Sequence, residues 1–385
     1  MSHQQRPWLG LWILTLACFA TITTEVVPIG LVPAIVQSFG VDEAQAGMLV
    51  TLYAMIVAIT AVPLTRITSH VQRKTLVLVT LAIFTGSNTL AAFAPDFLTL
   101  AIARGIAGVA HALFCAVALG YAARIAPPGL TGRALALVAT GTSAGLIVGV
   151  PAGAVVATAF GWRAAFGALA VIGAIAIVAA APLLPAVSHD RTAAKSLVPG
   201  GARMLLVAGL AGAAFLGYYT LYTYVSPLLL SSGLPDIWLG VVLAVLGVTG
   251  LLAIQLAARY IDRALMRWLM FVPLTITAMQ LLVSVVYPML LPVLIVTALW
   301  TASFGPVNTT YQNALVRVGA ANPDMAGAWI NVTCNLGIAG GAALGGVLVI
   351  GPGYPAAGWV GAAILAASTL VTLIFRRSLA TAITR

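Results

Sequence analysis

Residues 134–159 read ALALVATGTSAGLIVGVPAGAVVATA and contain no charged side chain. About 20 mostly apolar residues suffice for a helix to cross a bilayer, so this run is long enough to span a membrane. A glycine stands at every fourth position from 141 to 153. This spacing places the glycines on one face of the helix, where a second helix can approach closely. The stretch therefore predicts a transmembrane helix with a tightly packed neighbour.

Composition extends this prediction to the whole chain. Of the 385 residues, 62% are hydrophobic and 7% are charged, whereas about 25% of the residues of a soluble domain are charged. So few polar residues cannot cover a soluble core, and lipid must therefore contact much of the surface. The formal charge of +10 comes from short basic clusters between apolar runs, which indicates membrane topology rather than a nucleic-acid-binding patch. No disulfide framework is implied, because the three cysteines lie inside apolar runs, at Cys18, Cys115 and Cys334.

Twelve apolar runs are long enough to cross a membrane. The first follows Met1 to Trp8 without a small-residue cleavage site, which predicts a retained helix rather than a signal peptide. Proline-containing turns separate several of the runs. We therefore predict an all-α membrane protein with twelve transmembrane helices, near residues 9–36, 46–65, 75–94, 97–123, 134–159, 164–185, 204–231, 237–258, 268–287, 289–316, 325–350 and 356–375.

The basic residues predict the orientation of the chain. With the N-terminus in the cytoplasm, 16 of the 18 Lys and Arg residues fall in cytoplasmic segments. The exceptions are Arg163, in an outer loop, and Arg104, inside a helix. This asymmetry favours a multi-pass protein of a bacterial-type inner membrane with both termini in the cytoplasm. The outer loops carry acidic residues instead, at Asp42, Glu43, Asp96 and Asp236.

One polar connector, residues 188–203, divides the chain into two six-helix bundles at 1–187 and 204–385. The two halves echo each other. In the eleventh run Gly337, Gly341 and Gly345 repeat the four-residue glycine spacing of the fifth run. Two pseudo-symmetric bundles that rock about a central site are an architecture of secondary transporters.

Three ionisable side chains lie deep inside apolar runs, namely Glu25, Arg104 and His111. A charge at the bilayer centre costs about 2.5–3.5 kcal/mol on insertion scales, so such residues are expected beside a wet cavity or a partner. Glu25 is the one acid among them, and it is expected either to exchange a proton or to pack against backbone groups freed by Pro28. Arg104 keeps its charge, so it can pair with Glu25, bind backbone carbonyls or extend to the outer interface. His111 suits proton transfer or a hydrogen-bonded packing role.

Aromatic and amide side chains inside the spans are candidates for substrate binding. Tyrosines cluster in the seventh run, where their rings can stack on a polyol or an amphipathic drug and their hydroxyls can hydrogen-bond it. The alternatives are an interfacial aromatic belt for the tyrosines and helix-to-helix hydrogen bonding for the amides. The candidates are Tyr53, Phe114, Tyr218, Tyr219, Tyr222, Phe304, Asn308, Tyr311, Asn331 and Asn335.

Five motifs carry a resemblance to a known family. They are Leu100-x-x-x-Arg104-x-x-x-Gly108 with Ala110-His111-Ala112, Gly145-x-x-x-Gly149-Val150-Pro151-Ala152-Gly153, Gly161-Trp162-Arg163-Ala164-Ala165-Phe166, Glu25-x-x-Pro28-x-Gly30-Leu31-x-Pro33, and the run Tyr218 to Pro227. They resemble motifs of spans four, five, six, one and seven in the major facilitator superfamily. Within it, the chain is similar to the twelve-span drug:proton antiporters and their sugar-efflux branch, over nearly its whole length.

The loop motif of that family is only partly present. After span two the family reads Gly-x-x-x-Asp-Arg-x-Gly-Arg-Lys, whereas here Arg73-Lys74 match and Ser69 and His70 occupy the Asp-Arg positions. This departure weakens the expectation of a first-half latch, although the second half keeps Asp262-Arg263. The resemblance assigns conformational roles to the span-five and loop motifs, at Gly145, Gly149, Pro151, Gly153, Arg73, Asp262 and Arg263.

The resemblance implies a monomeric, proton-coupled antiporter that exports sugars, thiogalactosides or drugs to the periplasm, as in multidrug resistance. Glu25, Arg104 and His111 would carry the proton coupling, and no cofactor, metal ion or nucleic acid is expected. The nearest alternative is a uniporter or proton symporter of the same fold. A channel is disfavoured because pores are usually lined by rings from several subunits. An intramembrane enzyme is disfavoured because the spans lack His-Glu-x-x-His and a serine–base or paired-acid constellation.

Overall fold

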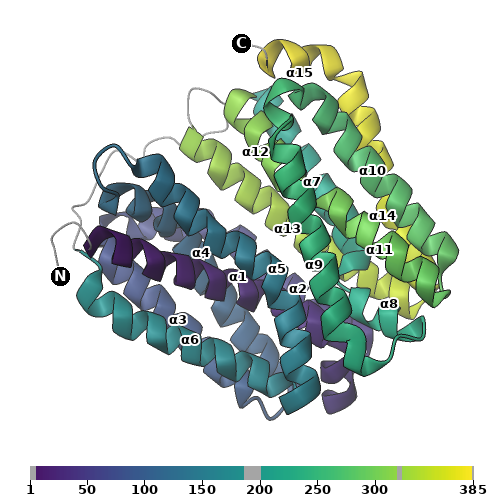
Figure 1. Cartoon of the computed structure of the whole chain (residues 1–385), viewed down its shortest axis with the longest axis horizontal. Coiled ribbons are helices and arrows are strands. Elements are labelled where there is room, and N and C mark those ends of the chain that lie inside the picture. Colours follow the sequence, from purple (N-terminus) through teal and green to yellow (C-terminus); the bar gives the residue numbers. More distant parts are fainter. Residues whose placement is uncertain (1–5, 186–200, 319–322, 384–385) are drawn as a thin grey trace. The chain divides into compact units, whose positions relative to one another are not determined.

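The computed structural model describes residues 6–185, 201–318 and 323–383. Twelve helices or helix pairs in these ranges are long and apolar enough to cross a membrane, which confirms the predicted all-α fold with twelve spans. The elements (Figure 1) are α1 (Arg6–Phe39), α2 (Glu43–Ile67), η1 (Thr68–His70), α3 (Arg73–Ala92), α4 (Phe97–Ile125), α5 (Thr131–Phe160), α6 (Trp162–Leu183), α7 (Ala202–Tyr222), α8 (Val225–Ser231), α9 (Asp236–Ala258), η3 (Ile261–Arg263), α10 (Leu265–Val286), α11 (Leu290–Phe304), α12 (Val307–Val318), α13 (Pro323–Ile350), α14 (Tyr354–Ile374) and α15 (Arg376–Ile383).

Two of the predicted spans are not single helices. The seventh is broken between α7 and α8 at Thr223 and Tyr224, and the tenth between α11 and α12 at Gly305 and Pro306. A proline lacks the N–H that would bond the carbonyl four residues earlier in a helix. Pro227 stands shortly after the first break, and Pro306 is part of the second. The seventh run stays mostly apolar through its break, so its sequence hides the interruption. In the tenth run Gly305-Pro306 and the polar residues of α12 mark the break, although the run was predicted as one span.

By its packing the chain divides into two compact units, of which the first comprises Met1–Pro28 and Met55–Lys195. In this unit α3 packs against α4 and α6, and α5 packs against α6 and α4. Asp96 accepts a hydrogen bond from the main-chain N–H of Thr99 at the start of α4. This bond holds the pKa of the exposed Asp96 carboxyl below its ordinary value. Arg163, the predicted outer-loop cation, donates to the carbonyl of Ala94 and lies 4.3 Å above the Trp162 ring.

The glycines of α5 pack directly against α1 in the first unit. A Cβ at Gly145 would lie 2.9 Å from the carbonyl oxygen of Phe19, and one at Gly149 would lie 3.1 Å from the Cα of Thr23. Real Cβ atoms do not tolerate such contacts without a shift of the backbone, so only glycine permits this approach. The glycine spacing thus predicts a close helix pair, and α1 is its partner.

The second unit comprises Ile29–Ala54 and Ser196–Arg385. Here α13 packs along α7, and the glycines of α13 repeat the contact made by α5 with α1. Gly341 and Gly345 lie against the main chain of Leu216 and Thr220. Each unit therefore contains a helix pair held in close contact by glycines at every fourth position. The remaining helices surround this pair, with α14 against α7 and α10, and α11 against α10 and α9.

The segment Ile29–Ala54, which contains the end of α1 and the start of α2, belongs to the second unit. The Tyr354 hydroxyl donates to the Glu43 carboxylate, with oxygen–oxygen distances of 2.7 and 2.8 Å. The Thr51 hydroxyl donates to the Ala339 carbonyl at 3.3 Å. The predicted connector falls mainly on residues 186–200, outside the described part of the chain, so the bundle boundaries at 187 and 204 stay a prediction.

Candidate functional site

Two prolines shape the part of α1 where the site lies. Pro28 and Pro33 lack N–H groups, so the carbonyls of Thr24 and Ile29 lose their intrahelical donors. A buried carbonyl without a donor costs free energy, so a side chain must replace the missing bond. Each of these two carbonyls receives one such bond, from a different helix.

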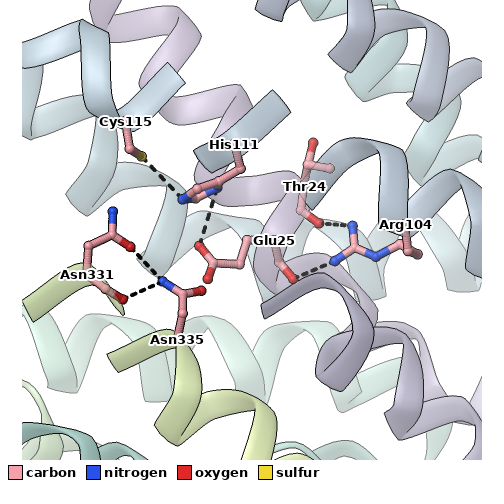
Figure 2. Close-up of polar contacts among 7 residues, drawn as sticks. All are labelled: Thr24, Glu25, Arg104, His111, Cys115, Asn331 and Asn335. Atoms are coloured by element: carbon pink, nitrogen blue, oxygen red, sulfur yellow. Dashed lines mark hydrogen bonds and ion pairs between the residues drawn. The ribbon is translucent and has the colours of Figure 1, made fainter. Parts of the chain in front are cut away.

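Arg104 of α4 replaces the bond lost at Pro28. Its Nη1 donates to the Thr24 carbonyl and its Nη2 donates to the Glu25 carbonyl at 3.1 Å, as Figure 2 shows. The side chain is 1% exposed, so the guanidinium is deep inside the protein. Of the predicted roles for Arg104, the structure shows the hydrogen bonds to backbone carbonyls. In the second unit the Ser226 hydroxyl donates to the Ile29 carbonyl at 2.8 Å, and it replaces the bond lost at Pro33.

The Glu25 carboxyl lies beside His111 rather than on the guanidinium (Figure 2). His111 Nδ1 is 3.9 Å from Glu25 Oε2, and the two side chains are 3% and 12% exposed respectively. The other ring nitrogen, Nε2, is 3.2 Å from the Cys115 sulfur, one turn further along α4. The pair is an ion pair only when the imidazole is protonated. The arrangement therefore places two groups that can each take up a proton side by side.

Helix packing fixes the backbone around Glu25. Gly149 and Gly153 of α5 lie against Thr23, Val26 and Val27 of α1. The Thr24 hydroxyl lies 3.3 Å from the amide nitrogen of Asn88, a buried side chain of α3 that the sequence analysis did not identify. An amide inside an apolar run was the available signal. Pro151, between the two glycines, is buried within α5.

A second cluster, which we call the aromatic cluster, lies in the second unit and comprises Tyr218, Tyr219, Tyr222, Trp300 and Phe304. Tyr218 stacks on Phe304 with ring centroids 3.7 Å apart, and it lies 4.8 Å from Tyr222. Trp300 is 4.7 Å from Tyr218 and is fully buried, whereas Tyr222 and Phe304 remain half-buried. Tyr222 and Phe304 therefore offer the accessible face, and the other rings support it.

Gln280 of α10 holds the aromatic cluster in place. Its side-chain oxygen accepts a hydrogen bond from the Trp300 indole N–H at 3.1 Å. Its amide nitrogen donates to the carbonyls of Gly217 and Gly358, at 3.0 and 3.3 Å. Neither Gln280 nor Trp300 was predicted from the sequence as a site residue. The spacing Trp300-x-x-x-Phe304 and a lone Gln in an apolar run were the available signals.

Both helices that carry the aromatic cluster end next to it. Tyr222 is the last residue of α7, and Phe304 is the last residue of α11. The C-terminal end of a helix carries free carbonyls and a partial negative charge. Discontinuous helices of this kind form substrate sites in other transporter folds. Such a site can accept hydroxyl donors or a cation, with an apolar ring face alongside.

The remaining predicted substrate residues fall into three groups. Tyr53, Phe114 and Tyr311 are fully buried, and Phe114 packs into the apolar core of the first unit. Asn308 is exposed on α12. The Asn335 amide donates to the side-chain oxygen of Asn331 at 2.7 Å (Figure 2). Contact of any of these residues with a substrate stays a prediction.

The predicted loop-latch residues lie at helix ends. Arg73 is half-buried at the first position of α3, and Arg263 is exposed at the end of η3. The side chain of Asp262 is outside the described part of the structure, so its role stays a prediction.

Twelve spans define a multi-pass membrane protein, and its family and fold point to a transporter rather than an enzyme. Residues 13–322 match the family model described as Major Facilitator Superfamily, and the chain belongs to that family. It is also similar to a crystal structure of a bacterial homologue of the human lysosomal transporter Spinster, in an inward-facing and unoccupied conformation. The TM-score is 0.67 at 16% sequence identity, over 100% of this chain and 98% of that chain, and this likeness concerns the fold.

Proposed function

We propose that this transporter is a proton-coupled antiporter that exports a sugar, a thiogalactoside or a drug from the cytoplasm to the periplasm. The position of the Glu25 carboxyl carries the proposal. The guanidinium of Arg104 is committed to main-chain carbonyls, and the Glu25 carboxyl lies beside His111. A carboxyl group in this position is free to change its protonation state as its surroundings change.

Substrate and proton then compete through alternating access. In the outward-open state Glu25 takes up a proton from the periplasm, and in the inward-open state it releases the proton as substrate binds. Linkage requires that protonation weaken substrate affinity by the same factor by which substrate disfavours protonation. His111 is the proposed relay between Glu25 and the aqueous cavity, because imidazole can accept a proton on one nitrogen and donate one from the other.

The aromatic cluster is the proposed substrate surface. Tyr222 and Phe304 would stack on the apolar face of a sugar ring or on an aromatic drug, while carbonyls at the ends of α7 and α11 accept its hydroxyl or cationic groups. The chain would act as a monomer in a bacterial inner membrane. The distribution of Lys and Arg supports cytoplasmic termini, and the resemblance of the span-five motif supports export.

Transport by purified protein in liposomes with an acidic lumen tests the proposal. An antiporter accumulates labelled thiogalactoside or cationic drug in the acidic compartment, because outflowing protons drive substrate inward. A symporter accumulates it in the alkaline compartment, and a uniporter only equilibrates it. Glu25→Gln should abolish accumulation and keep equilibration, whereas Asp236→Asn, the corresponding change at an exposed acid, should preserve accumulation. Accumulation by Glu25→Gln at the wild-type level would contradict the proposed role of Glu25.

A further inference from the structure

An apolar groove crosses the outer face of α9, α10 and α11 in the second unit. It encloses a cavity of about 510 Å³, and its walls include Leu256, Phe271 and Leu299. These three side chains are more than half exposed, as is usual for side chains that face lipid. A hydrophobic groove alone would therefore mark only a surface in contact with bulk lipid.

Residues 259–267, next to one end of the groove, carry three arginines and one aspartate, a net positive charge. Arg259 and Arg263 are exposed between α9 and α10, and Arg267 is exposed in the first turn of α10. Tyr260 and Trp268, each adjacent in sequence to one of these arginines, line the groove itself. Aromatic side chains of this kind sit at the headgroup level of a membrane, so the arginines lie where phosphate groups are found.

The two aliphatic hydroxyls of the groove wall already make hydrogen bonds inside the protein. The Thr275 hydroxyl donates to the Val272 carbonyl at 2.9 Å, and the Ser303 hydroxyl donates to the Trp300 carbonyl at 2.6 Å. The wall thus presents hydrocarbon rather than hydrogen-bonding partners, which disfavours a sugar or another polar ligand there. The groove matches a flexible hydrocarbon chain, and its basic end matches an anion.

We propose that this groove is a specific site for one anionic phospholipid, such as phosphatidylglycerol, from the leaflet that faces the α9–α10 turn. One acyl chain lies between α9, α10 and α11, and the headgroup phosphate contacts the arginines through charge-assisted hydrogen bonds. The residues of the site are not those of the aromatic cluster, and the proposal does not depend on the transported substrate.

Fluorescence of Trp268 tests the site directly. The protein is placed in nanodiscs of phosphatidylcholine that contain phosphatidylglycerol with brominated acyl chains, which quench a tryptophan on contact. The Trp268 signal is the difference between wild type and Trp268→Phe. Each arginine near a membrane surface contributes about 1 kcal/mol toward an anionic lipid, or about fivefold in affinity, so two should contribute about 30-fold at low salt. Wild type should therefore show a strong preference for brominated phosphatidylglycerol over brominated phosphatidylcholine.

Two further variants separate the headgroup from the chain. Arg263→Gln with Arg267→Gln should lower the preference for phosphatidylglycerol by about 30-fold, whereas Arg376→Gln with Arg377→Gln removes equal charge on α15 and should preserve it. Ala302→Phe fills the groove and should remove the quenching of Trp268 without a change of charge. Equal quenching by both lipids in wild type, equal losses in the two arginine pairs, or full quenching in Ala302→Phe would each overturn the proposal. Unchanged thermal unfolding of the variants establishes that they are folded.

Discussion

The bond between Arg104 and the carbonyl freed by Pro28 can be tested by a double-mutant cycle. Arg104→Met keeps the length of the side chain and removes its donors, so the Thr24 carbonyl is left without a partner. An unsatisfied buried carbonyl costs about 1–3 kcal/mol. Pro28→Ala restores the N–H at position 28, which can donate to Thr24 within the helix. Arg104→Met should therefore destabilise the protein less in the Pro28→Ala background than in wild type.

The size of this coupling follows from the environment. Polar pairs measured by double-mutant cycles in a membrane protein average about 0.6 kcal/mol and reach about 1.7 kcal/mol. Because Arg104 makes a charge-assisted bond and is 1% exposed, we expect a coupling free energy in the upper part of that range, about 1.2–1.7 kcal/mol. Unfolding by SDS in mixed micelles, followed by tryptophan fluorescence, gives the four free energies of unfolding.

Pro33 provides the matched control for this cycle. The carbonyl that it frees belongs to Ile29 and accepts from Ser226, not from Arg104. Pro33→Ala with Arg104→Met should therefore be additive within about 0.3–0.5 kcal/mol, as expected of sites without a shared partner. Pro33→Ala with Ser226→Ala should couple instead. The reasoning fails if Arg104→Met has the same cost with Pro28 as with Ala at position 28.

Three more predictions concern the two units. Gln280→Leu should lower the free energy of unfolding by about 1–3 kcal/mol and weaken ligand binding, because the Trp300 indole and two carbonyls lose their hydrogen bonds. Gln255→Leu, at an exposed site on α9, should change neither quantity in the same unfolding and binding assays. Gly149→Val should abolish transport in proteoliposomes because it clashes with Thr23 and Val26, whereas Gly86→Val, with open space around its added carbon, should retain it. Tyr354→Phe removes the donor to Glu43. It should raise the labelling rate of a cysteine at Thr51, in a background without native cysteines, by about fivefold for a bond worth about 1 kcal/mol. An unchanged rate would show that this bond does not restrict access to position 51.

The spans could be predicted from the sequence because a bilayer demands long apolar runs. The close helix pairs could be predicted because a glycine at every fourth position leaves one face of a helix without side chains. The break after Tyr222 could not, since Val225 to Leu230 continue the run with mostly apolar residues. The break after Phe304 was not predicted either, although Gly305-Pro306 and the polar start of α12 signal it. Charge and depth alone indicate that Glu25, Arg104 and His111 have a special environment. They do not distinguish a bond from Arg104 to the Glu25 carboxylate from the bonds that it makes to main-chain carbonyls.

Tertiary packing accounts for the other differences. Gln280 and Trp300 are ordinary residues in their own runs, and their importance arises only because three helices meet around the Gln280 amide. Ile29–Ala54 precedes the predicted connector in sequence, yet it packs with residues 196–385. No local pattern encodes such a pairing, because it depends on which conformation the assembled helices adopt.

Proton release on ligand binding tests the central role of Glu25 most directly. Detergent-purified protein in weakly buffered solution is titrated with a thiogalactoside or a cationic drug that it binds, and the pH is recorded. Wild type and Asp236→Asn should release protons as ligand binds, with affinity that falls as the pH is lowered. Glu25→Gln should bind without release and with affinity independent of pH. Ligand binding to wild type without proton release, or release that persists in Glu25→Gln, would contradict the account.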